Sequence, residues 1–428
     1  MQGTVPAPLK CASQMDGLGK KCYSNKKYLY KYNESCCIPS LGMIDDTFMA
    51  SRCGIQSVQM NALINTFIEG KKLYFNTKKC YVMHLGPKGD ECPQLKVHSE
   101  NMRTTTKEKY LGDIISVRGN IDNIENRKKI ANLAISEILA VLREIGQGSF
   151  YVKTGIIFRD AVLKCKVLLN SEVWHCLTSQ QVEILESIDK QFIRTILKSH
   201  SKVSIECLYL ETGKYPYKYD IMVRRCMYLW KLLHVEEDEL IYRVFQSQSN
   251  SSHQGDWVRQ IESDRKEIEL NLDNSEISKM SKNKFKNVVQ KKVENLALND
   301  LNKLKNKHTK SSYLNSNSFK MSAYLNDSRF STRETQVLFS LRSHTLNVRK
   351  NFGNKFSDTL CEVCHLFPET QAHLLQCPVI TPKLKMVSAG SGINEESVYG
   401  SVEDQLKIAK IYCKILEIRK EILREAEE

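Results

Sequence analysis

The sequence contains no run of about 18 apolar residues, and its first ten residues, MQGTVPAPLK, lack the apolar core of a secretion signal. These absences predict an intracellular chain that does not engage a membrane, in either the nucleus or the cytoplasm. Acidic residues are in deficit, with 49 Asp and Glu against 63 Lys and Arg, so the formal net charge is +14. This surplus favours a polyanionic partner such as nucleic acid, although a solvated basic surface gives the same charge.

The hydrophobic residues are numerous enough for several cores. At about 100–200 residues per domain, 428 residues with 41% hydrophobic content predict two to four structural units. Fifteen cysteines are scattered along the chain, and this odd number favours reduced thiols over a disulfide framework. Most of them are expected to be buried as small hydrophobic residues. Only Cys361, Cys364 and Cys377 cluster with a histidine, His373.

The hydrophobic pattern predicts a change of architecture near residue 118. Residues 37–116 mix strand-like and helical stretches, whereas residues 121–245 follow helical periodicity with few breakers. Residues 109–115 are typical of one short strand, which ends at the turn signal of residues 118–120. We therefore expect strands and helices first, and mostly helices afterwards.

Three helices are predicted after this change. The first follows the capping-box pair Asp122 and Glu125, the second covers residues 154–170, and the third follows the pair Thr178 and Gln181. Their apolar stripes predict a bundle. Basic residues on the outer faces could follow a phosphate backbone, although solvated helix faces have the same composition. These residues are Arg127, Lys128, Lys129, Lys153, Arg159, Lys164, Lys166, Lys190, Arg194 and Lys198.

Two further stretches precede the C-terminal region. Residues 201–272 continue the helical pattern, with tyrosines and a tryptophan among lysines and arginines. Such aromatic residues can stack on bases, but at helical spacing they more often belong to a core. Residues 281–320 are rich in Asn and Ser and contain ten Lys against one Glu and one Asp. This composition predicts a mobile or loosely helical basic linker over residues 273–321.

The Cys/His cluster has the spacing of a zinc site. Cys361 and Cys364 form a C-x-x-C knuckle, His373 follows after eight residues, and Cys377 follows after three more. Two thiolates from one knuckle, with an imidazole and a thiolate from a following helical stretch, form a closed tetrahedral shell. Because no position remains open for water, we expect a structural Zn²⁺ ion.

Two alternatives to this zinc shell remain open. His365, beside the knuckle, could replace His373, which we prefer because Leu374 and Leu375 could pack while Cys377 turns back to the metal. Buried reduced cysteines without metal are the other alternative. The small C-terminal unit ends in a helix that Ser401 and Asp404 cap, and it has few apolar residues. We therefore expect metal removal to unfold it while the rest of the chain stays intact.

Two adjacent carboxylates, Asp45 and Asp46, lie between apolar residues on both sides. At a turn between two short strands, paired acids can hold divalent cations such as Mg²⁺, which prefer oxygen ligands. An Asp-Asp pair is also common in an ordinary polar turn. The choice between these interpretations depends on the surrounding motifs.

Four motifs occur in order around these carboxylates. They are the glycine-containing residues 2–9, the Met-Ile-Asp-Asp residues 43–46, the helical residues 61–72 followed by residues 73–80, and residues 109–112. In this order they resemble the reverse transcriptase of non-LTR (LINE-type) retrotransposons, and the resemblance extends over most of the chain. Met43 stands where Phe or Tyr is more usual. A similar C-terminal Cys/His motif, ending in His-Leu-Leu-x-Cys, also belongs to this family.

The resemblance implies a two-metal phosphoryl transfer in which a primer 3′-hydroxyl attacks a dNTP, with RNA and DNA as partners. It makes Asp45 and Asp46 catalytic, with Asp45 binding Mg²⁺. The implied nucleotide- and template-binding residues are Gln2, Gly3, Lys78 and Lys79. The implied primer grip consists of Tyr110, Leu111 and Gly112.

In this family a further metal-binding aspartate and the fingers lie upstream of the glycine motif, where the sequence begins. We therefore expect Mg²⁺ binding to be weak or vestigial and this chain to be inactive by itself, unless the gene product extends upstream. The expected function is that of a retrotransposon reverse-transcriptase-domain protein, an RNA-directed DNA polymerase by descent. The alternative is a non-enzymatic RNA- or DNA-binding protein with a structural zinc site.

The predicted fold class is α+β, a partial polymerase palm followed by mostly helical regions and a small zinc-binding unit. The predicted units are a partial palm (1–118), a helical thumb (119–200), a helical connection (201–272), the linker (273–321) and the zinc unit with its final helix (322–428).

Overall fold

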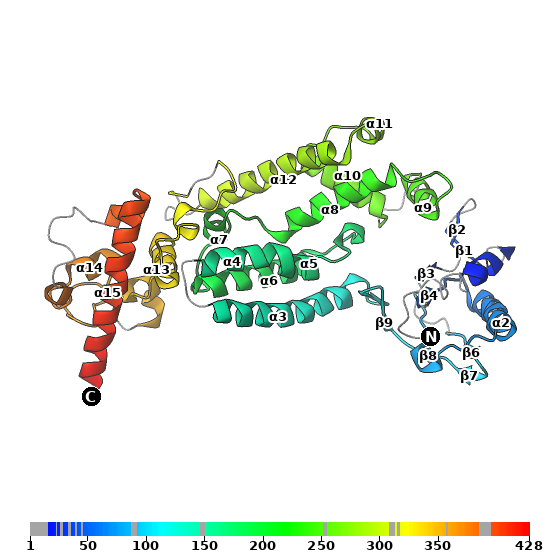
Figure 1. Ribbon diagram of the computed structural model, residues 1–428, viewed down its shortest axis with the longest axis horizontal. Helices are drawn as coiled ribbons and strands as arrows, with labels where there is room; N and C mark the ends of the chain where they lie inside the picture. Colours follow the sequence, from blue (N-terminus) through cyan, green and yellow to red (C-terminus); the bar gives the residue numbers. More distant parts are fainter. Residues whose placement is uncertain are drawn as a thin grey trace.

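The structure, a computed structural model, is mixed and dominated by helices, which confirms the coarse part of the predicted fold class. It describes residues 16–22, 24–25, 29–32, 36–38, 41–43, 46–86, 92–145, 150–250, 255–307, 313–314, 317–356, 358–384 and 395–428. In these residues the last strand ends at Ser116 and the next helix begins at Asn120. The strands gather at one end of the molecule, long helices form the middle, and α13–α15 form the other end (Figure 1).

The strands form five separate two-stranded pairs within the described residues. The antiparallel pairs are β1 (Tyr30–Lys31) with β2 (Cys37–Ile38), β3 (Leu41–Met43) with β4 (Asp46–Phe48), β6 (Lys96–Val97) with β7 (Glu100–Asn101), and β9 (Lys107–Tyr110) with β10 (Asp113–Ser116). The parallel pair is β5 (Tyr81–Val82) with β8 (Arg103–Thr104). Because these pairs do not join into a larger sheet, the palm assignment stays a prediction.

The predicted single strand over residues 109–115 is wrong, because the chain reverses within it. Strands β9 and β10 pair as a hairpin in which Tyr110 faces Asp113. Between them, Leu111 and Gly112 have φ values of 47° and 91°. Two successive residues with positive φ form the tight turn that matches the twist of a hairpin. Glycine allows this conformation at the second position without strain.

Helices form most of the chain after residue 118. They are α3 (Asn120–Ile145), α4 (Tyr151–Phe158), α5 (Lys164–Val167), α6 (Ser179–Leu197), α7 (Ile205–Thr212), α8 (Tyr217–Leu232), α9 (Leu240–Ser249), α10 (Trp257–Glu267), α11 (Asn274–Ser278), α12 (Lys282–Lys305), α13 (Thr332–Arg342), α14 (Gln371–Gln376) and α15 (Val402–Glu427). A π-helical turn, η3 (Arg159–Leu163), joins α4 to α5. Short 3₁₀ turns are η2 (Thr77–Lys79), η4 (Ser171–Val173), η6 (Ala323–Leu325), η7 (Arg349–Lys355), η8 (Thr381–Leu384) and η9 (Glu395–Val398). Helix α2 (Gly54–Gly70) lies among the strands (Figure 1).

Local capping signals predict two helix starts correctly and a third less well. The Thr178–Gln181 and Ser401–Asp404 pairs both form complete capping boxes, at α6 and α15. Helix α3, in contrast, begins at Asn120, so Asp122 lies inside its first turn. The buried Asp122 carboxylate accepts a hydrogen bond from the Ser116 hydroxyl at 2.5 Å, and this bond ties the helix to β10.

Of the two alternatives for the linker over residues 273–321, mobile or loosely helical, the mobile one is wrong for most of its length. Residues 282–305 form α12, in which Phe285, Val289, Val293, Ala297 and Leu301 are buried. These residues recur every four positions, so they form one stripe. The first four pack in a core with residues of α8 and α10, and Leu301 belongs to the core of the bundle. The lysines that dominate the composition lie around this stripe. The segment is therefore a structural helix with a basic exterior.

Three of the basic residues assigned to outer helix faces are buried in ion pairs instead. Arg159 is 1% exposed and pairs with Asp189, which is fully buried, with Nη2–Oδ2 at 2.6 Å. Arg127 pairs with Asp113 of β10, and Lys190 pairs with the exposed Glu183. Burial of a charge requires a partner, and each of these cations has one.

The aromatic residues of the 201–245 stretch mostly belong to the core. Tyr209, Tyr217 and Tyr219 are each no more than 1% exposed. The Tyr209 hydroxyl donates to Asp189 at 3.0 Å, and Arg159 lies over the Tyr217 ring at 4.9 Å. These contacts favour the core interpretation over base stacking at these three residues.

The C-terminal region shares its core with the helical bundle, and its expected shortage of apolar residues is not found. Buried residues from α3, α6, α13 and α15 belong to one continuous cluster. Between the two parts, the buried Arg342 of α13 donates to Glu211 of α7, with Nε–Oε1 at 2.8 Å. The Ser322 N–H donates to the Glu211 carbonyl at 2.9 Å. Gly213, with φ of 64°, lies so close to Met321 that an added Cβ would overlap the Met321 backbone nitrogen.

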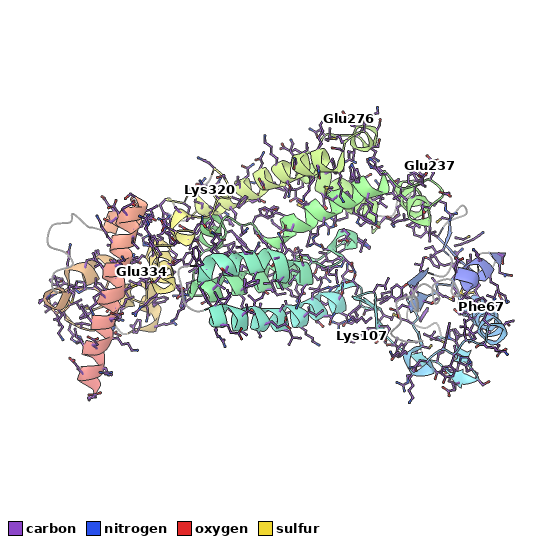
Figure 2. All side chains as sticks on the ribbon, viewed as in Figure 1. Phe67, Lys107, Glu237, Glu276, Lys320 and Glu334 are labelled. Carbon is purple, nitrogen blue, oxygen red and sulfur yellow. The ribbon has the colours of Figure 1, made fainter. Side chains whose placement is uncertain are left out.

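Three labelled side chains help to locate the N-terminal part, its junction with the long helices, and the opposite end of the molecule. Figure 2 shows Phe67 in the N-terminal part, Lys107 where that part joins the long helices, and Glu334 at the opposite end. Phe67 is buried in a small core with Leu18 and Ile68. This core is separate from the cluster that contains α13 and α15, so the N-terminal part packs mainly on itself.

Candidate metal centre

The Cys361 knuckle is held by its own backbone. Leu360 and Pro368 form an isolated antiparallel bridge, and the Cys361 N–H donates to the Phe367 carbonyl at 2.8 Å. The His365 N–H donates to the Cys361 carbonyl at 2.9 Å, and His365 has a positive φ of 55°. This tight turn brings the Cys361 and Cys364 thiols to the same side. The C-x-x-C spacing therefore has the local geometry of a two-thiol ligand.

Helix α14 carries His373, and Cys377 directly follows the last residue of the helix. Thr370 caps the helix, and its hydroxyl accepts from the His373 N–H at 2.9 Å. His373 and Cys377 are four residues apart, so they lie on one face of the helix. At the end of the helix, the Thr381 N–H and hydroxyl donate to the Cys377 carbonyl at 2.9 and 2.8 Å. These bonds hold Cys377 beside the knuckle.

The four ligand atoms meet at one point. The three sulfur atoms and one imidazole nitrogen all lie within 4.8 Å of one another, and Cys364 Sγ is 3.3 Å from His373 Nε2. Zinc–ligand bonds of about 2.0–2.3 Å in a tetrahedron separate neighbouring ligand atoms by roughly 3.5–3.8 Å. Cys361 and Cys377 are fully buried, whereas Cys364 and His373 are partly exposed. This Cys₃His group could hold a metal ion, and its donor set is consistent with zinc.

The environments of the ligands differ in how they favour ionisation. Burial, together with nearby Cys377, raises the pKa of the Cys361 thiol to about 12. Burial also opposes ionisation of Cys364, but hydrogen bonds from the Leu366 and Phe367 backbone N–H groups lower its pKa below the usual value. Burial lowers the pKa of His373, which keeps the imidazole in its neutral, metal-binding form. Cys364 therefore ionises more readily than Cys361.

A network of charged side chains joins the knuckle to α15. Glu369 is fully buried and accepts from Arg419 Nε at 3.0 Å and from the Arg349 N–H at 2.8 Å. Arg419 also donates to Glu362, the residue after Cys361, at 2.5 Å. Sequence reasoning missed this network, because Arg419 lies 50 residues from Glu369 and no local signal connects them.

His365, the alternative ligand, lies outside the metal group. Its side chain is exposed, whereas the four ligands of the group come together without it. The preference for His373 therefore agrees with the geometry.

The residues implied by the polymerase resemblance lie apart from this centre. Asp46 is exposed on β4, where it faces Met43 of β3. Lys78 and Lys79 are exposed in η2, whose preceding residue Asn76 accepts from the Lys78 N–H at 3.1 Å. Asp45, Gln2 and Gly3 lie outside the described residues. Within the described residues, the Cys/His group is the only one that could hold a metal, so the Mg²⁺ expectation has no support there.

The predicted primer-grip residues lie at the β9–β10 hairpin turn. The Tyr110 hydroxyl donates to the Leu41 carbonyl of β3 at 3.3 Å, and the Tyr110 ring is 5.7 Å from the ring of Phe48 in β4. Burial, together with the negative charge of Asp46, raises the pKa of Tyr110. The hairpin that carries Asp46 and the hairpin that carries Leu111 and Gly112 are therefore in direct contact.

Comparison with family models and with curated proteins adds no relative. No family model matches the chain, and no curated protein is significantly similar to it. Within the part of the chain that the structure describes, no helix combines the length and the apolar character needed to cross a membrane.

Proposed function

We propose that the chain is a nucleic-acid-binding protein that descends from a non-LTR retrotransposon reverse transcriptase and carries a structural zinc site. The observation that carries this proposal is the contact between Tyr110 and the β3–β4 hairpin. In a polymerase palm, the residues that hold the primer must lie beside the carboxylates that bind the catalytic metals. Tyr110 of the predicted primer grip contacts Leu41 and Phe48 of the hairpin that carries Asp46, and this contact supports the proposal.

The zinc site supports the same proposal as a stabilising element. Four protein ligands complete a tetrahedral shell, so such an ion organises the fold and leaves no open position for catalysis.

The exposed lysines of α12 supply a surface for a polyanion. Lys282, Lys284, Lys286 and Lys291 are exposed, and none of them forms an ion pair with a described carboxylate. Unpaired surface cations of this kind attract phosphate backbones and release counterions on binding.

We expect the purified chain to bind RNA without extending a primer on an RNA template in Mg²⁺ or Mn²⁺. Two-metal transfer needs carboxylates from more than one strand. In the described part of the chain, no carboxylate belongs to a group that could hold a metal ion. Incorporation of labelled dNTP, measured in samples whose RNA binding is verified by fluorescence anisotropy, checks this expectation. Template-dependent incorporation that Asp45→Ala abolishes would instead make Asp45 a catalytic ligand.

We also expect the α12 lysines to contribute to RNA binding through counterion release. Replacing Lys282, Lys284, Lys286 and Lys291 by glutamine should lower the slope of log affinity against log salt by about 3, at about 0.7 for each phosphate contact with a single strand. Deletion of the helix is not a suitable test, because its apolar stripe belongs to a core.

The matched control removes the same charge from lysines that already pair with carboxylates. These are Lys20, Lys166, Lys383 and Lys414, which pair with Asp16, Glu137, Glu425 and Glu417. We expect this control variant to keep the wild-type slope. An equal loss of slope in both variants would mean that net charge, rather than the α12 surface, determines binding.

A further inference from the structure

A second cationic group lies where the bundle meets the C-terminal region. The loop after α6 contributes His200 and Lys202, and η7 contributes Phe352 and Lys355. The His200 ring lies 4.6 Å from the Phe352 ring, centroid to centroid. The ammonium nitrogens of Lys202 and Lys355 lie 5.2 and 5.7 Å from the same Phe352 centroid. Two segments about 150 residues apart thus place three basic side chains around one ring.

The ring at the centre of this group is fixed, and the lysines are accessible. Phe352 is 4% exposed, whereas Lys202 and Lys355 are exposed side chains. A cation over an aromatic ring is weakly attracted to it at an exposed site. This attraction favours the positions of both ammonium groups near the ring.

No described carboxylate neutralises this group. Neither Lys202 nor Lys355 forms an ion pair with a described acid, and the neighbouring Asp358 and Glu362 are paired with Arg349. The two ammonium groups are close enough to affect His200, since burial, Lys355 and Lys202 all lower the pKa of its imidazole. Like charges held together without a counter-charge create a positive potential that attracts anions.

His200 contributes a neutral donor to the same place. Its Nδ1 atom accepts a hydrogen bond from the Lys202 N–H at 3.0 Å. In the neutral ring the proton is therefore on Nε2, which is a hydrogen-bond donor. One N–H donor and two ammonium groups are the kinds of group that bind phosphate oxygens.

We propose that His200, Lys202 and Lys355 form a phosphate-binding site. The inference rests on the proposed function in one respect. Given that function, the bound phosphates belong to the backbone of a single-stranded nucleic acid. The η7 turn ends at Lys355, six residues before Cys361 in the sequence. A ligand bound at this site would contact both the bundle, through His200 and Lys202, and the C-terminal region, through Lys355.

The test compares a double variant, Lys202→Gln with Lys355→Gln, with a control of equal charge, Lys20→Gln with Lys414→Gln. The control lysines are exposed and already paired with Asp16 and Glu417. The first probe is a fluorescein-labelled oligouridylate, titrated by anisotropy over a range of salt concentrations. The second probe is inorganic tripolyphosphate, titrated by calorimetry. Circular dichroism verifies that both variants are folded.

We expect the double variant to lower the salt slope for the oligonucleotide by about 1.4 and to weaken binding roughly 25-fold at about 0.1 M salt, while the control keeps the wild-type values. We also expect only the double variant to lose tripolyphosphate binding. A different result would separate the two proposals. If neither the wild type nor any variant binds the oligonucleotide, but the double variant alone fails to bind tripolyphosphate, the proposed function is wrong and the phosphate site is supported. Unchanged oligonucleotide slopes with unchanged tripolyphosphate binding would overturn the site.

Discussion

We expect the wild-type chain to bind one zinc ion and the Cys364→Ser variant to lose it. A hydroxyl is a far poorer ligand than a thiolate for this ion, and the pKa of the Cys364 thiol is below its usual value. His373→Ala should lose the ion as well, because it removes the only nitrogen ligand of the set. Metal content of the purified variants, measured by plasma mass spectrometry, checks both expectations.

Loss of the ion should also destabilise more than the knuckle. With free zinc about a thousandfold above its dissociation constant, binding adds about 4 kcal/mol to the free energy of unfolding. Cys361 and Cys377 belong to the same buried cluster as residues of α3 and α6, so we expect faster hydrogen exchange in the bundle as well as in α13–α15. This differs from the expectation drawn from the sequence, in which the C-terminal unit unfolds alone.

His365→Ala is the matched control for the zinc variants. Its imidazole is exposed and lies outside the ligand group, so this variant should keep one zinc ion per chain and the wild-type stability. Retention of one equivalent of zinc by both Cys364→Ser and His373→Ala would reject the site and leave the cysteines as packing residues.

Asp189→Ala is expected to be among the most destabilising single substitutions in the bundle. Asp189 is fully buried and accepts from Arg159 Nη2 at 2.6 Å, from Arg159 Nε at 2.7 Å and from the Tyr209 hydroxyl at 3.0 Å. Its removal leaves the Arg159 guanidinium buried without its main counter-charge, which costs about 3–5 kcal/mol. Urea unfolding followed by circular dichroism measures the change in the free energy of unfolding.

Two further variants test whether the loss of stability in Asp189→Ala comes from the buried ion pair. Glu137→Ala breaks the exposed Lys166 pair and should cost less than about 1 kcal/mol. The double variant Arg159→Met with Asp189→Leu replaces both charges and should recover much of the stability, because the pair then no longer needs desolvation. A cost for Asp189→Ala equal to that for Glu137→Ala would show that the buried pair does not stabilise the bundle.

Features that depend on residues close in sequence could be predicted. The capping boxes at Thr178 and Ser401 need only a partner three residues on, and both form. The four zinc ligands span a short segment whose spacing fixes the knuckle and the helix, and they meet. The stripe of α12 was also present in the sequence, but the number of lysines around it led to the prediction of a linker. A count of apolar residues at four-residue spacing would have identified the helix.

Features that depend on distant partners could not be predicted. A surface arginine and a buried one look the same in sequence, and Arg159 finds Asp189 only after the helices pack. Arg419 and Arg342 meet their carboxylates across 50 and 131 residues. The hairpin turn at Leu111 was hidden for another reason, because leucine seldom adopts the positive φ that it has there.

The contact of α7 with the C-terminal region limits how this chain can exchange parts with related chains. Gly213 has no room for a side chain beside Met321, and Glu211 needs Arg342 as its buried partner. A C-terminal region grafted after α12 would have to supply both a close backbone segment and an arginine at the right depth. Without them, the hybrid would bury an unpaired carboxylate. Recombination that keeps the fold therefore needs a breakpoint before α7, so that the zinc centre and its docking helix are inherited as one unit.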